Sequence, residues 1–458
     1  MKLVVIGGDA AGMSAASQAR KRRGDDLTVV VFERGHYSSY SACGIPYWIG
    51  GSVKDRDALV ARSPEAHRRA GLDVRTRHEV VGIDLDRREV VAHDLDGGGE
   101  VRESFDHLVY AAGAVPVTPP WARVSGAGVF GVQTLDDGEA IHTWLDNDPA
   151  PRRAVVIGGG YIGVEMAEAM VRRDLEVTLL EKAPQPLSTV DPDMGARVRD
   201  AIIGLGIEVR VNAQVDGLEM AGGRVRGVVT PDGTLPADIV VLGLGVRPNT
   251  TLAAESGIPI GVTGGVRTDL QMRVVGPSAS LDGLWAAGDC VQTTHRVSGQ
   301  PVHVPLGTHA NKQGRVAGIN IGGGYATFPG VVGTAVTKVC ELEVARTGLT
   351  EKEATASGYA FVTATVESTS RAGYYPGAAT MVIKLIAEKR TGLLLGAQIV
   401  GSTEAGKRID ALAIALWNQM TVEEMTALDL SYAPPFSPVW DPVLIAARKA
   451  TDAVHAAG

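Results

Sequence analysis

Short runs of apolar residues that end in glycine turns recur along this chain and predict buried strands. Leu3–Ile6 is the first such run, and a stretch rich in small residues follows its glycine turn as far as Arg20. A second apolar run, Leu27–Phe32, ends at the acid Glu33. Continuous apolar runs on either side of a helical segment are typical of parallel strands that are covered on both faces. The beginning of the chain therefore predicts a βαβ unit.

The same order of elements returns near the middle of the chain. Ala154–Ile157 is an apolar run before three glycines, and a helical pattern follows as far as about Arg173. Glu176–Leu180 is then a strand that ends at Glu181. The repeated length is that of a whole βαβ unit, which differs from a short solenoid repeat. The chain is therefore expected to contain two units of the Rossmann type.

Three later segments continue the strand pattern. Phe105–Pro116 and Ala237–Asn249 each predict a strand that ends in a glycine turn, and Leu284–Ala287 predicts a short strand just before Asp289. From about Gly330 the pattern changes to longer strand-like stretches. This last third contains a strand-like segment, a helical segment and a proline-rich loop, which are Thr380–Ile386, Lys407–Met420 and Ser431–Pro438.

Size and composition narrow the class of protein. At 458 residues, with 45% apolar and 21% charged, the chain is long enough for two or three globular domains. A net charge of −8 argues against a nucleic-acid-binding surface, which would be basic. Three cysteines cannot build a disulfide framework, which favours a cytoplasmic protein. Neither a signal peptide nor an apolar run long enough to span a membrane is expected.

The first glycine turn favours binding of a dinucleotide. Gly7 and Gly12 lie between strand and helix, where glycines let the backbone approach a pyrophosphate at the helix N-terminus. Glu33, 21 residues after Gly12, is expected to hydrogen-bond the ribose of the adenosine half. The usual second glycine is replaced by Asp9, an acid that is unfavourable beside a pyrophosphate unless its side chain points away.

The second glycine turn has the complete fingerprint. Gly158, Gly160 and Gly163 follow the strand, and Glu181 ends the next strand. Because the charge of Glu181 would repel a 2′-phosphate, NADH is favoured over NADPH, although the adjacent Lys182 weakens this preference. Two complete units indicate two dinucleotides, FAD and a nicotinamide cofactor.

Cys43 is the residue with the clearest chemistry. It lies ten residues after Glu33, and the other two cysteines, Cys290 and Cys340, are far downstream and are expected to be core residues. A thiol beside a dinucleotide site without a second cysteine indicates that the second sulfur or oxygen comes from the substrate. We expect Gly44–Pro46 to begin a helix, whose N-terminus would lower the pKa of the thiol.

Along essentially its whole length the chain resembles the pyridine nucleotide-disulfide oxidoreductase superfamily. Ser39–Cys43 and Ala287–Asp289 are similar to motifs of this superfamily. Within it, the chain resembles the single-cysteine branch, which comprises coenzyme A-disulfide reductases, coenzyme A persulfide reductases and NADH oxidases, and the segments Gly373–Gly377 and Tyr432–Phe436 carry this similarity. Classical members have a second cysteine five residues after the first, where this chain has Trp48.

The resemblance implies an α/β fold of the glutathione-reductase type, with two Rossmann-like domains and a C-terminal α+β dimerisation domain. The expected FAD-binding domain comprises residues 1–115 and 245–328, with the NAD(P)-binding domain at 116–244 and the dimerisation domain at 329–458. A homodimer is implied as well. In it, Tyr374 and Tyr432 of one subunit would reach the active site of the other; without the resemblance they could equally be packing residues of an interface.

The resemblance also implies roles for individual residues. Lys54 is expected to pair with Glu165 near the flavin, and Asp289 to hold its ribityl chain. Ala42 stands where the family often has an asparagine that contacts coenzyme A. The expected cofactor-binding residues are Gly7, Gly12, Glu33, Ser41, Lys54, Ala112, Gly113, Gly158, Gly160, Gly163, Glu165, Glu181, Gly245 and Asp289. The residues that match coenzyme A-contacting positions are Ser14, Gln18, Lys21, Ser39 and Asn311.

Taken together, the residues and the resemblance favour an FAD-dependent NAD(P)H oxidoreductase that reduces a disulfide or persulfide of a small thiol, with coenzyme A as the expected thiol. Cys43 would be the redox-active residue, with Tyr374 or Tyr432 as proton donor. Two alternatives remain open. One is an NADH oxidase that reduces oxygen or peroxide through a Cys43 sulfenate. The other is a redox-sensing or sulfur-tailoring flavoprotein with low disulfide turnover. No metal site is expected.

Overall fold

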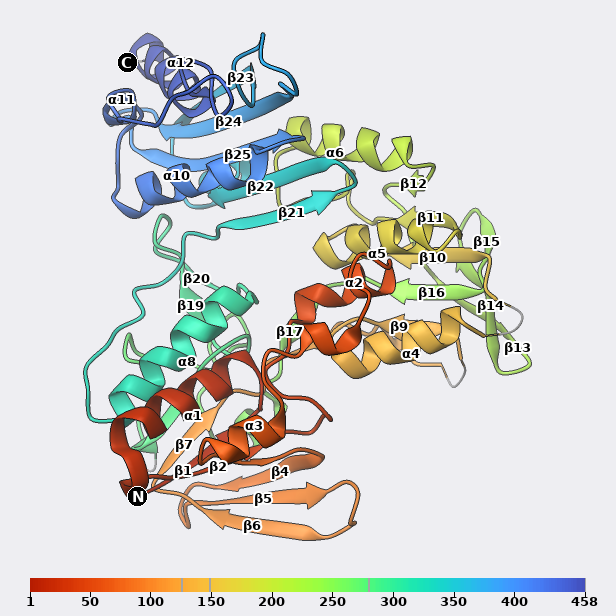
Figure 1. The fold of residues 1–458 in the computed structure, drawn as a ribbon, viewed down its shortest axis with the longest axis vertical. Helices are drawn as coiled ribbons and strands as arrows, with labels where there is room; N and C mark the ends of the chain where they lie inside the picture. The colour runs from red at the N-terminus through yellow and green to blue at the C-terminus, as the bar shows by residue number, and fades with distance from the viewer. Residues whose placement is uncertain (125–126, 148–149, 279–280, 458) are drawn as a thin grey trace.

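The computed structural model describes residues 1–124, 127–147, 150–278 and 281–457, and these form three units around three five-stranded sheets (Figure 1). Two of the sheets are parallel and arrange four of their strands in the same order, whereas the fifth strand comes from a later segment in one sheet and from an earlier segment in the other. The third sheet is antiparallel. Within the described ranges, no helix is both long and apolar enough to cross a membrane.

The first sheet is the βαβ unit that the opening residues predict. Its strand order is β18-β7-β1-β2-β3, with every neighbouring pair parallel. The strands of the sheet are β1 (Lys2–Ile6), β2 (Thr28–Phe32), β3 (Asp73–Arg75), β7 (His107–Tyr110) and β18 (Leu284–Ala286). Because β18 comes from the segment after the second βαβ unit, the chain leaves this sheet and returns to complete it.

Helices and small sheets surround this first sheet. A three-stranded antiparallel sheet, β4 (His78–Asp84), β5 (Glu89–Asp94) and β6 (Glu100–Ser104), lies beside it (Figure 1). Two-stranded pairs join β8 (Ala114–Pro116) to β17 (Val246–Pro248) and β19 (Thr293–Thr294) to β20 (Pro301–Val302). The helices are α1 (Ala10–Arg23), α2 (Ile45–Ile49), α3 (Pro64–Arg69), α7 (Thr251–Glu255) and α8 (Gly307–Ile321), and the 3₁₀ turns are η1 (Gly24–Asp26), η2 (Ala42–Gly44) and η3 (Arg56–Leu59).

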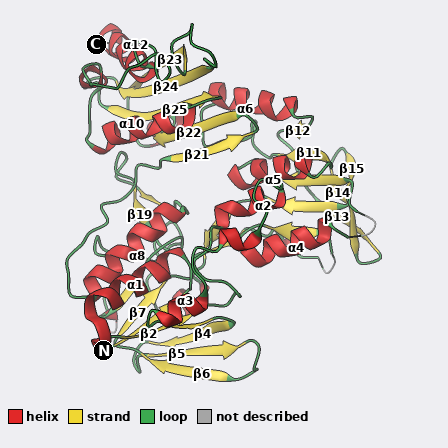
Figure 2. Cartoon of the chain, in the orientation of Figure 1, coloured by secondary structure: helices red, strands yellow, loops and turns green. Residues whose placement is uncertain are grey.

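Helices α1 and α8 lie side by side in the first unit (Figure 2). Glycine makes this approach possible. A Cβ atom at Gly314 would stand 2.1 Å from the carbonyl oxygen of Ala11, and one at Gly318 would stand 2.4 Å from that of Ala15. The expected helix after the first glycine turn is confirmed, and it continues three residues beyond Arg20 to Arg23.

The second unit repeats the first. Its sheet has the order β12-β11-β10-β16-β9, again parallel throughout. A three-stranded antiparallel sheet, β13-β14-β15, lies beside it. The elements are β9 (Val129–Gly131), β10 (Arg153–Ile157), β11 (Glu176–Leu180), β12 (Glu208–Arg210), β13 (Gly217–Ala221), β14 (Arg224–Thr230), β15 (Gly233–Pro236), β16 (Ile239–Leu242), η4 (Pro120–Ala122), α4 (Leu135–Leu145), α5 (Tyr161–Arg172) and α6 (Pro192–Gly204).

The third unit is an antiparallel sheet with helices, as the change of pattern after Gly330 indicates. Its strand order is β21-β22-β25-β24-β23. The strands are β21 (Ala335–Val339), β22 (Leu342–Gly348), β23 (Phe361–Thr369), β24 (Thr380–Glu388) and β25 (Leu394–Gly401), and the helices are α9 (Glu351–Ala356), α10 (Ala405–Trp417), α11 (Val422–Met425) and α12 (Pro442–Ala457). The proline-rich segment 431–438 is free of helix and strand, as expected.

The packing of helix α2 joins the first two units. Ile45, Trp48 and Ile49 are buried in one apolar cluster with residues of α4 and α5. The ring of Trp48 stacks on His142 at 5.1 Å between ring centroids. The segment that follows Cys43 is thereby held between the two dinucleotide-type units.

Candidate functional site

The first glycine turn is tight enough to require glycine. Gly7 has a φ of 105°, and a Cβ there would stand 2.2 Å from the carbonyl oxygen of Ala111. A Cβ at Gly12 would stand 1.9 Å from the carbonyl oxygen of Gly7. These contacts pack the start of α1 directly on the end of β1, which leaves the helix N-terminus open to a bound anion.

Glu33 lies at the end of β2 beside this turn. Its two carboxylate oxygens accept hydrogen bonds from the backbone N–H groups of Gly8 at 2.7 Å and Gly35 at 2.6 Å. Burial raises the pKa of Glu33, and these two hydrogen bonds oppose that rise. The structure therefore brings Glu33 to the turn, as expected for a residue that contacts an adenosine ribose.

The side chain of Asp9 contacts the loop that precedes Cys43. Its Oδ1 accepts a hydrogen bond from the backbone N–H of Tyr40 at 3.1 Å, which ties the start of α1 to the loop before Cys43. Burial, together with the negative charges of Glu33 and Asp289, raises the pKa of Asp9 to about 7, although the hydrogen bond from Tyr40 acts in the opposite direction. Below that pH the carboxyl is neutral, so the acid is compatible with a nearby phosphate.

Asp289 follows β18 at the same end of the first sheet. Burial raises its pKa, and His303 acts in the opposite direction. The imidazole of His303 lies 2.8 Å from the backbone carbonyl oxygen of Asp289. The glycine turn after β7 is also close, because the backbone N–H of Ala287 donates to the carbonyl of Tyr110 at 3.1 Å. Asn249 holds this turn, since its backbone N–H donates to the carbonyl of Gly113 at 3.0 Å and its side chain donates to that of Ala112 at 3.2 Å.

The second glycine turn repeats this geometry. A Cβ at Gly158 would stand 2.3 Å from the carbonyl oxygen of Gly243, and one at Gly163 would stand 1.8 Å from that of Gly158. By contrast, a Cβ at Gly160 would meet no atom within 4 Å. The backbone at Gly160 therefore faces open space, which suits the close approach of a pyrophosphate.

Glu181 has the same relation to the second turn as Glu33 has to the first. Its carboxylate accepts hydrogen bonds from the backbone N–H groups of Gly159 at 2.5 Å and Ala183 at 2.6 Å. Gly245, another of the expected cofactor-binding residues, has a φ of 80°, and its carbonyl accepts a hydrogen bond from the backbone N–H of Val117. Both turns thus have the glycines and the acid that a dinucleotide site needs.

Cys43 lies in η2 and is exposed. Ser41, the residue before this turn, donates its backbone N–H to the carbonyl of Leu59 at 2.8 Å. The loss of hydration caused by surrounding atoms raises the pKa of the Cys43 thiol, and the charges of Glu165 and Asp289 raise it further. The expectation of a lowered pKa is therefore wrong for the ligand-free chain, because carboxylates face the thiol and α2 is a helix of only five residues.

The other two cysteines do not accompany Cys43. Cys290 is fully buried in the core of the first unit, and burial raises its pKa to about 12. Cys340 is partly buried in the turn between β21 and β22, where burial raises its pKa to about 11. All three cysteines are free thiols. Trp48, at the position of the second cysteine of classical members, is buried as a packing residue.

Glu165 has a different partner from the one that the sequence predicts. Its Oε1 accepts a hydrogen bond from the hydroxyl of Thr337 on β21 at 2.7 Å. Lys54 is exposed and forms no ion pair with Glu165 in the described ranges of the chain. Burial raises the pKa of Glu165, and the Thr337 hydrogen bond opposes this. Among the described residues, Glu165 is therefore held by Thr337, and the expected pair with Lys54 is not formed.

The two tyrosines lie on the third unit. Tyr374 is 80% exposed and Tyr432 is 48% exposed. Their segments are adjacent, since the backbone N–H of Ala372 donates to the carbonyl of Pro434 at 3.1 Å. Several large apolar side chains beside them are also exposed, namely Tyr375, Phe436, Val439 and Trp440.

The expected substrate-binding positions gather partly on α1 and α8. The hydroxyl of Ser14 donates to the side chain of Asn311 at 2.8 Å, so these two positions meet across the helix pair. Gln18 and Lys21 follow on α1, with Lys21 exposed. Ser39 lies in the loop before Cys43, where its hydroxyl is 2.9 Å from His67 Nε2.

Sequence reasoning missed His67 and Thr337. His67 is 2% exposed, burial lowers its pKa to about 4, and its Nδ1 has no hydrogen-bond partner in the structure. Nothing in the local sequence marks either residue, because each acquires its role from a contact distant in the chain. No group of three or more metal-ligating side chains occurs in the part of the chain that the structure describes.

Two family models match the chain. Residues 1–314 match the pyridine nucleotide-disulphide oxidoreductase model, and residues 334–442 match the dimerisation domain of the same family. The fold and the second parallel unit expected from the sequence are therefore confirmed.

Similar proteins cover nearly the whole chain. An NAD(P)H coenzyme A polysulfide/persulfide reductase from Pyrococcus horikoshii is 38% identical over 98% of both chains. An NADH oxidase from Methanocaldococcus jannaschii is 35% identical over 98% of both chains. The solved structure of an NAD-dependent persulfide reductase from A. fulgidus has a TM-score of 0.94 at 38% identity, covering 99% of this chain and 83% of that one.

Proposed function

The chain belongs to the pyridine nucleotide-disulphide oxidoreductase family, and on that premise we propose that it is an FAD-dependent NAD(P)H oxidoreductase that reduces a disulfide or persulfide of a small thiol. Coenzyme A is the thiol that we propose, because the relative from Pyrococcus horikoshii is named for it. This agrees with the function expected from the sequence.

One observation carries the proposal: Cys43 is an exposed thiol between the two dinucleotide-type turns, and it has no second cysteine beside it. The position that would hold a second thiol is the buried Trp48. A single accessible sulfur can form a disulfide only with a sulfur of the substrate. The site therefore suits a small-molecule disulfide or persulfide rather than an internal dithiol relay.

The residues of the first unit fit FAD. The turn at Gly7 and Gly12 has no room for side chains, Glu33 is held beside it at the end of β2, and Asp289 follows β18 at the same end of the sheet. Bound FAD would transfer two electrons from a reduced nicotinamide to sulfur. The second turn, with Gly158, would hold the nicotinamide cofactor.

Cys43 carries the exchange chemistry. Its thiolate attacks one sulfur of the substrate disulfide, a mixed disulfide with Cys43 forms, and the other sulfur leaves as a thiolate that takes a proton. Two electrons, supplied in net terms by the nicotinamide, then break the mixed disulfide, which restores the Cys43 thiolate and releases the second thiol. The sum is one NAD(P)H and one proton consumed with one disulfide, giving NAD(P)⁺ and two thiols.

NADH is the coenzyme that we propose. The carboxylate of Glu181 is held by two backbone N–H groups at the second turn, where it can accept hydrogen bonds from a ribose diol. A 2′-phosphate at that position would meet the negative charge of Glu181.

A homodimer is also proposed, with the third unit as the interface. Its sequence matches the family's dimerisation domain, and its exposed aromatic side chains include Tyr374 and Tyr432. Buried against a second copy, these tyrosines would lie where a hydroxyl can donate a proton to a leaving thiolate.

Anaerobic oxidation of NADH by the FAD-loaded protein tests the proposal. Turnover is expected to require coenzyme A disulfide and to vanish in Cys43→Ser, whereas the visible absorbance of bound flavin should be retained in that variant. Absence of disulfide-dependent turnover in the wild type would contradict the reductase.

The similarity to the NADH oxidase from Methanocaldococcus jannaschii supports a second candidate function, reduction of oxygen. It predicts that admitting air, rather than adding the disulfide, restores NADH oxidation. The two activities are separated by measuring both acceptors at equal NADH concentration on one preparation.

A further inference from the structure

Helix α5 presents a polar face to the third unit. Tyr161, Glu165 and Glu168 are spaced four and three residues apart, which places them on one side of the helix. The helix begins at the second glycine turn, so movement along this face would displace the dinucleotide site. The partners of these three residues determine how the helix is held.

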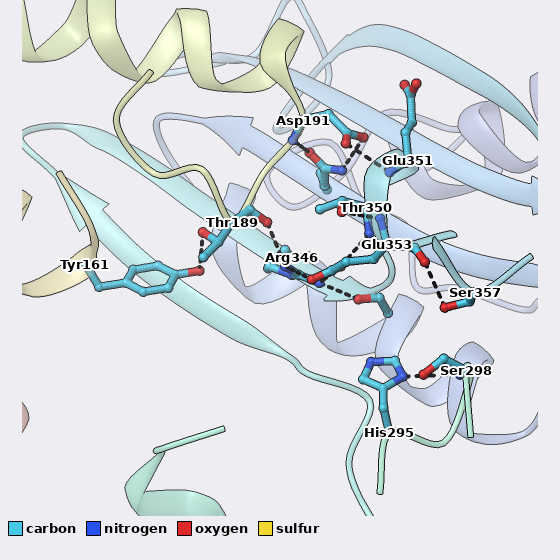
Figure 3. A network of polar contacts seen from close by, with 12 residues as sticks. Tyr161, Thr189, Asp191, His295, Ser298, Arg346, Thr350, Glu351, Glu353 and Ser357 are labelled. Carbon is cyan, nitrogen blue, oxygen red and sulfur yellow. Dashed lines mark hydrogen bonds and ion pairs between the residues drawn. The ribbon is translucent and has the colours of Figure 1, made fainter. Parts of the chain in front are cut away.

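The third unit donates hydrogen bonds directly to Glu165 and Glu168, and it reaches Tyr161 through one intervening residue. The Thr337 hydroxyl donates to Glu165 at 2.7 Å, and the backbone N–H of Cys340 donates to Glu168 at 2.7 Å. The Tyr161 hydroxyl is reached through Thr189, whose backbone carbonyl accepts from the buried Arg346 (Figure 3). Strand β21, the turn that follows it and strand β22 therefore all help to hold helix α5.

Of the three residues on this face of α5, Glu165 is the one whose charge acts on the redox-active thiol. Its negative charge raises the pKa values of both Cys43 and Tyr47. It also lines a cavity of about 160 Å³ together with Pro46 and Tyr47 of helix α2. The other ionisable groups around it are Glu168 on its own helix, Tyr161 one turn earlier, and Arg172, Lys338 and Cys340 at the cavity or its rim.

Thr337 is well placed to control this carboxyl. It is 6% exposed, and its strand register is fixed by pairing with Val344 on β22. Its hydroxyl is the side-chain donor that Glu165 has among the described residues. A buried carboxylate with one donor loses that stabilisation when the donor is removed.

We propose that Thr337 is a positioning residue for Glu165, so that the C-terminal unit helps to form the redox site of its own chain. The inference rests on the proposed function only in taking Cys43 as the redox-active thiol. It assigns to the third unit a role in the reaction centre that is separate from dimerisation. The residue acts through Glu165 and does not itself contact the reacting sulfur.

The effect of removing the hydroxyl has a definite sign. Without the donor, the pKa of Glu165 rises, because the charged form loses its hydrogen bond. Glu165 then stays neutral to higher pH. Its charge no longer opposes ionisation of Cys43 in that range, so the Cys43 thiolate becomes more abundant.

The rate at which iodoacetamide alkylates Cys43 tests these effects. It is measured on the FAD-loaded protein as a function of pH, by mass spectrometry of the peptide that contains Cys43. In the wild type, the profile is expected to show an inflection where Glu165 ionises. Thr337→Val should move that inflection to higher pH and make alkylation several-fold faster between the two inflections. Thr337→Ser, which keeps the hydroxyl, should restore the wild-type profile.

A matched control is available in the same sheet. Thr347 is 1% exposed and its hydroxyl pairs with that of Thr334 at 2.7 Å, remote from α5 in the hydrogen-bond network. Thr347→Val makes the same chemical change without touching Glu165, and should leave the profile unchanged. A shift of equal size in Thr347→Val would show a general structural effect and would overturn the proposal.

Glu165→Gln completes the design. This variant should lack the inflection, and Thr337→Val should have no further effect in its background. A wild-type profile in Thr337→Val, or an inflection retained in Glu165→Gln, would each overturn the proposal. Because alkylation needs no disulfide substrate, these results do not depend on whether the protein reduces coenzyme A disulfide.

Discussion

Asp9 is an acidic residue at a position of the first glycine turn that is ordinarily glycine, and other carboxylates lie near it. Burial is the largest cause of a rise in its pKa from 3.8 to about 7, and the charges of Glu33 and Asp289 contribute to the same rise. The folded protein therefore binds a proton that the unfolded chain releases between these two values. Since the folded state binds more protons in that window, stability falls as pH rises from about 4 to about 7 and then levels off.

Asp9→Asn is expected to remove this dependence. The asparagine carbonyl can still accept the hydrogen bond from the Tyr40 backbone, but no charge is left to bury. The variant should match the wild type near pH 4 and exceed it by a few kcal/mol at pH 8, since each pKa unit corresponds to about 1.4 kcal/mol. Urea unfolding at both pH values measures the difference.

A second substitution separates charge from hydrogen bonding at this position. Asp9→Val removes both, so it should gain the same relief of charge but leave the Tyr40 N–H without its acceptor. If Asp9→Asn shows the same loss of stability between pH 4 and pH 7 as the wild type, Asp9 does not titrate as described.

For individual residues, the sequence predicts a role correctly where that role depends on neighbours close in the chain. Glu33 and Glu181 follow their strands directly, so their places at the glycine turns could be inferred from spacing. The hydrogen bond between Thr337 and Glu165 joins residues 172 positions apart, and no local pattern announces it. The raised pKa of Cys43 was missed for the same reason, because it is caused first by burial among surrounding atoms and then by the charges of Glu165 and Asp289, which are distant in the chain.

At the scale of elements, the two glycine turns make a matched pair of substitutions possible. Gly12→Ala would place a Cβ 1.9 Å from the backbone carbonyl of Gly7, so α1 must shift away from β1. We expect this variant to lose about 1–3 kcal/mol and to bind FAD poorly. Gly160→Ala meets no atom within 4 Å and has a φ of −73°, so its stability should not change.

Gly160→Ala should instead raise the KM for NADH, because its methyl group stands where the dinucleotide approaches. Thermal unfolding, flavin content and KM, measured on both variants, distinguish the two roles. A stable, FAD-loaded Gly12→Ala protein would contradict the packing argument for the first turn.

The strands that continuous apolar runs predict are those of the two parallel sheets, because both faces of such strands are buried. The antiparallel strands β4–β6 and β13–β15 were not predicted. Many of their residues are only partly buried or are exposed, as in β13, where Leu218 is partly buried and Glu219 is exposed. A half-exposed strand of this kind gives a much weaker signal than a continuous apolar run.

At the scale of the whole molecule, a buried lysine joins the second and third units. Lys384 on β24 is 4% exposed and forms ion pairs with Asp191, Asp193 and Glu351. Asp191 is itself 3% exposed and also accepts a hydrogen bond from Gln398. Removing the cation would leave a buried carboxylate without its counter-charge.

Lys384→Met is therefore expected to destabilise the protein by about 3 kcal/mol, a magnitude typical of breaking a buried ion pair from one side. Lys389→Met, at an exposed position soon after the same strand, should be close to neutral. Urea unfolding of the two variants compares them, and equal stability would show that the ion pairs do not hold the units together.

An active site built from residues of both subunits can be distinguished from one built within a single subunit. Cys43 lies in the first unit, whereas Tyr432 is exposed on the third unit and forms no hydrogen bond to the Cys43 loop among the described residues. If Tyr432 serves the Cys43 of its partner, a dimer of one Cys43→Ser subunit and one Tyr432→Ala subunit contains one intact site. That site combines Cys43 of the second subunit with Tyr432 of the first.

Such a mixed dimer, purified through two different affinity tags, should show about half of the wild-type activity, as one of its two symmetric sites is complete. Each homodimer of the variants should be far less active. If Tyr432 instead served its own subunit, one subunit would lack the thiol and the other the hydroxyl, so mixing would restore nothing. Disulfide-dependent NADH oxidation by the mixed dimer therefore distinguishes the two arrangements. Activity in the mixed dimer requires that the C-terminal unit of one copy face the Cys43 loop of the other.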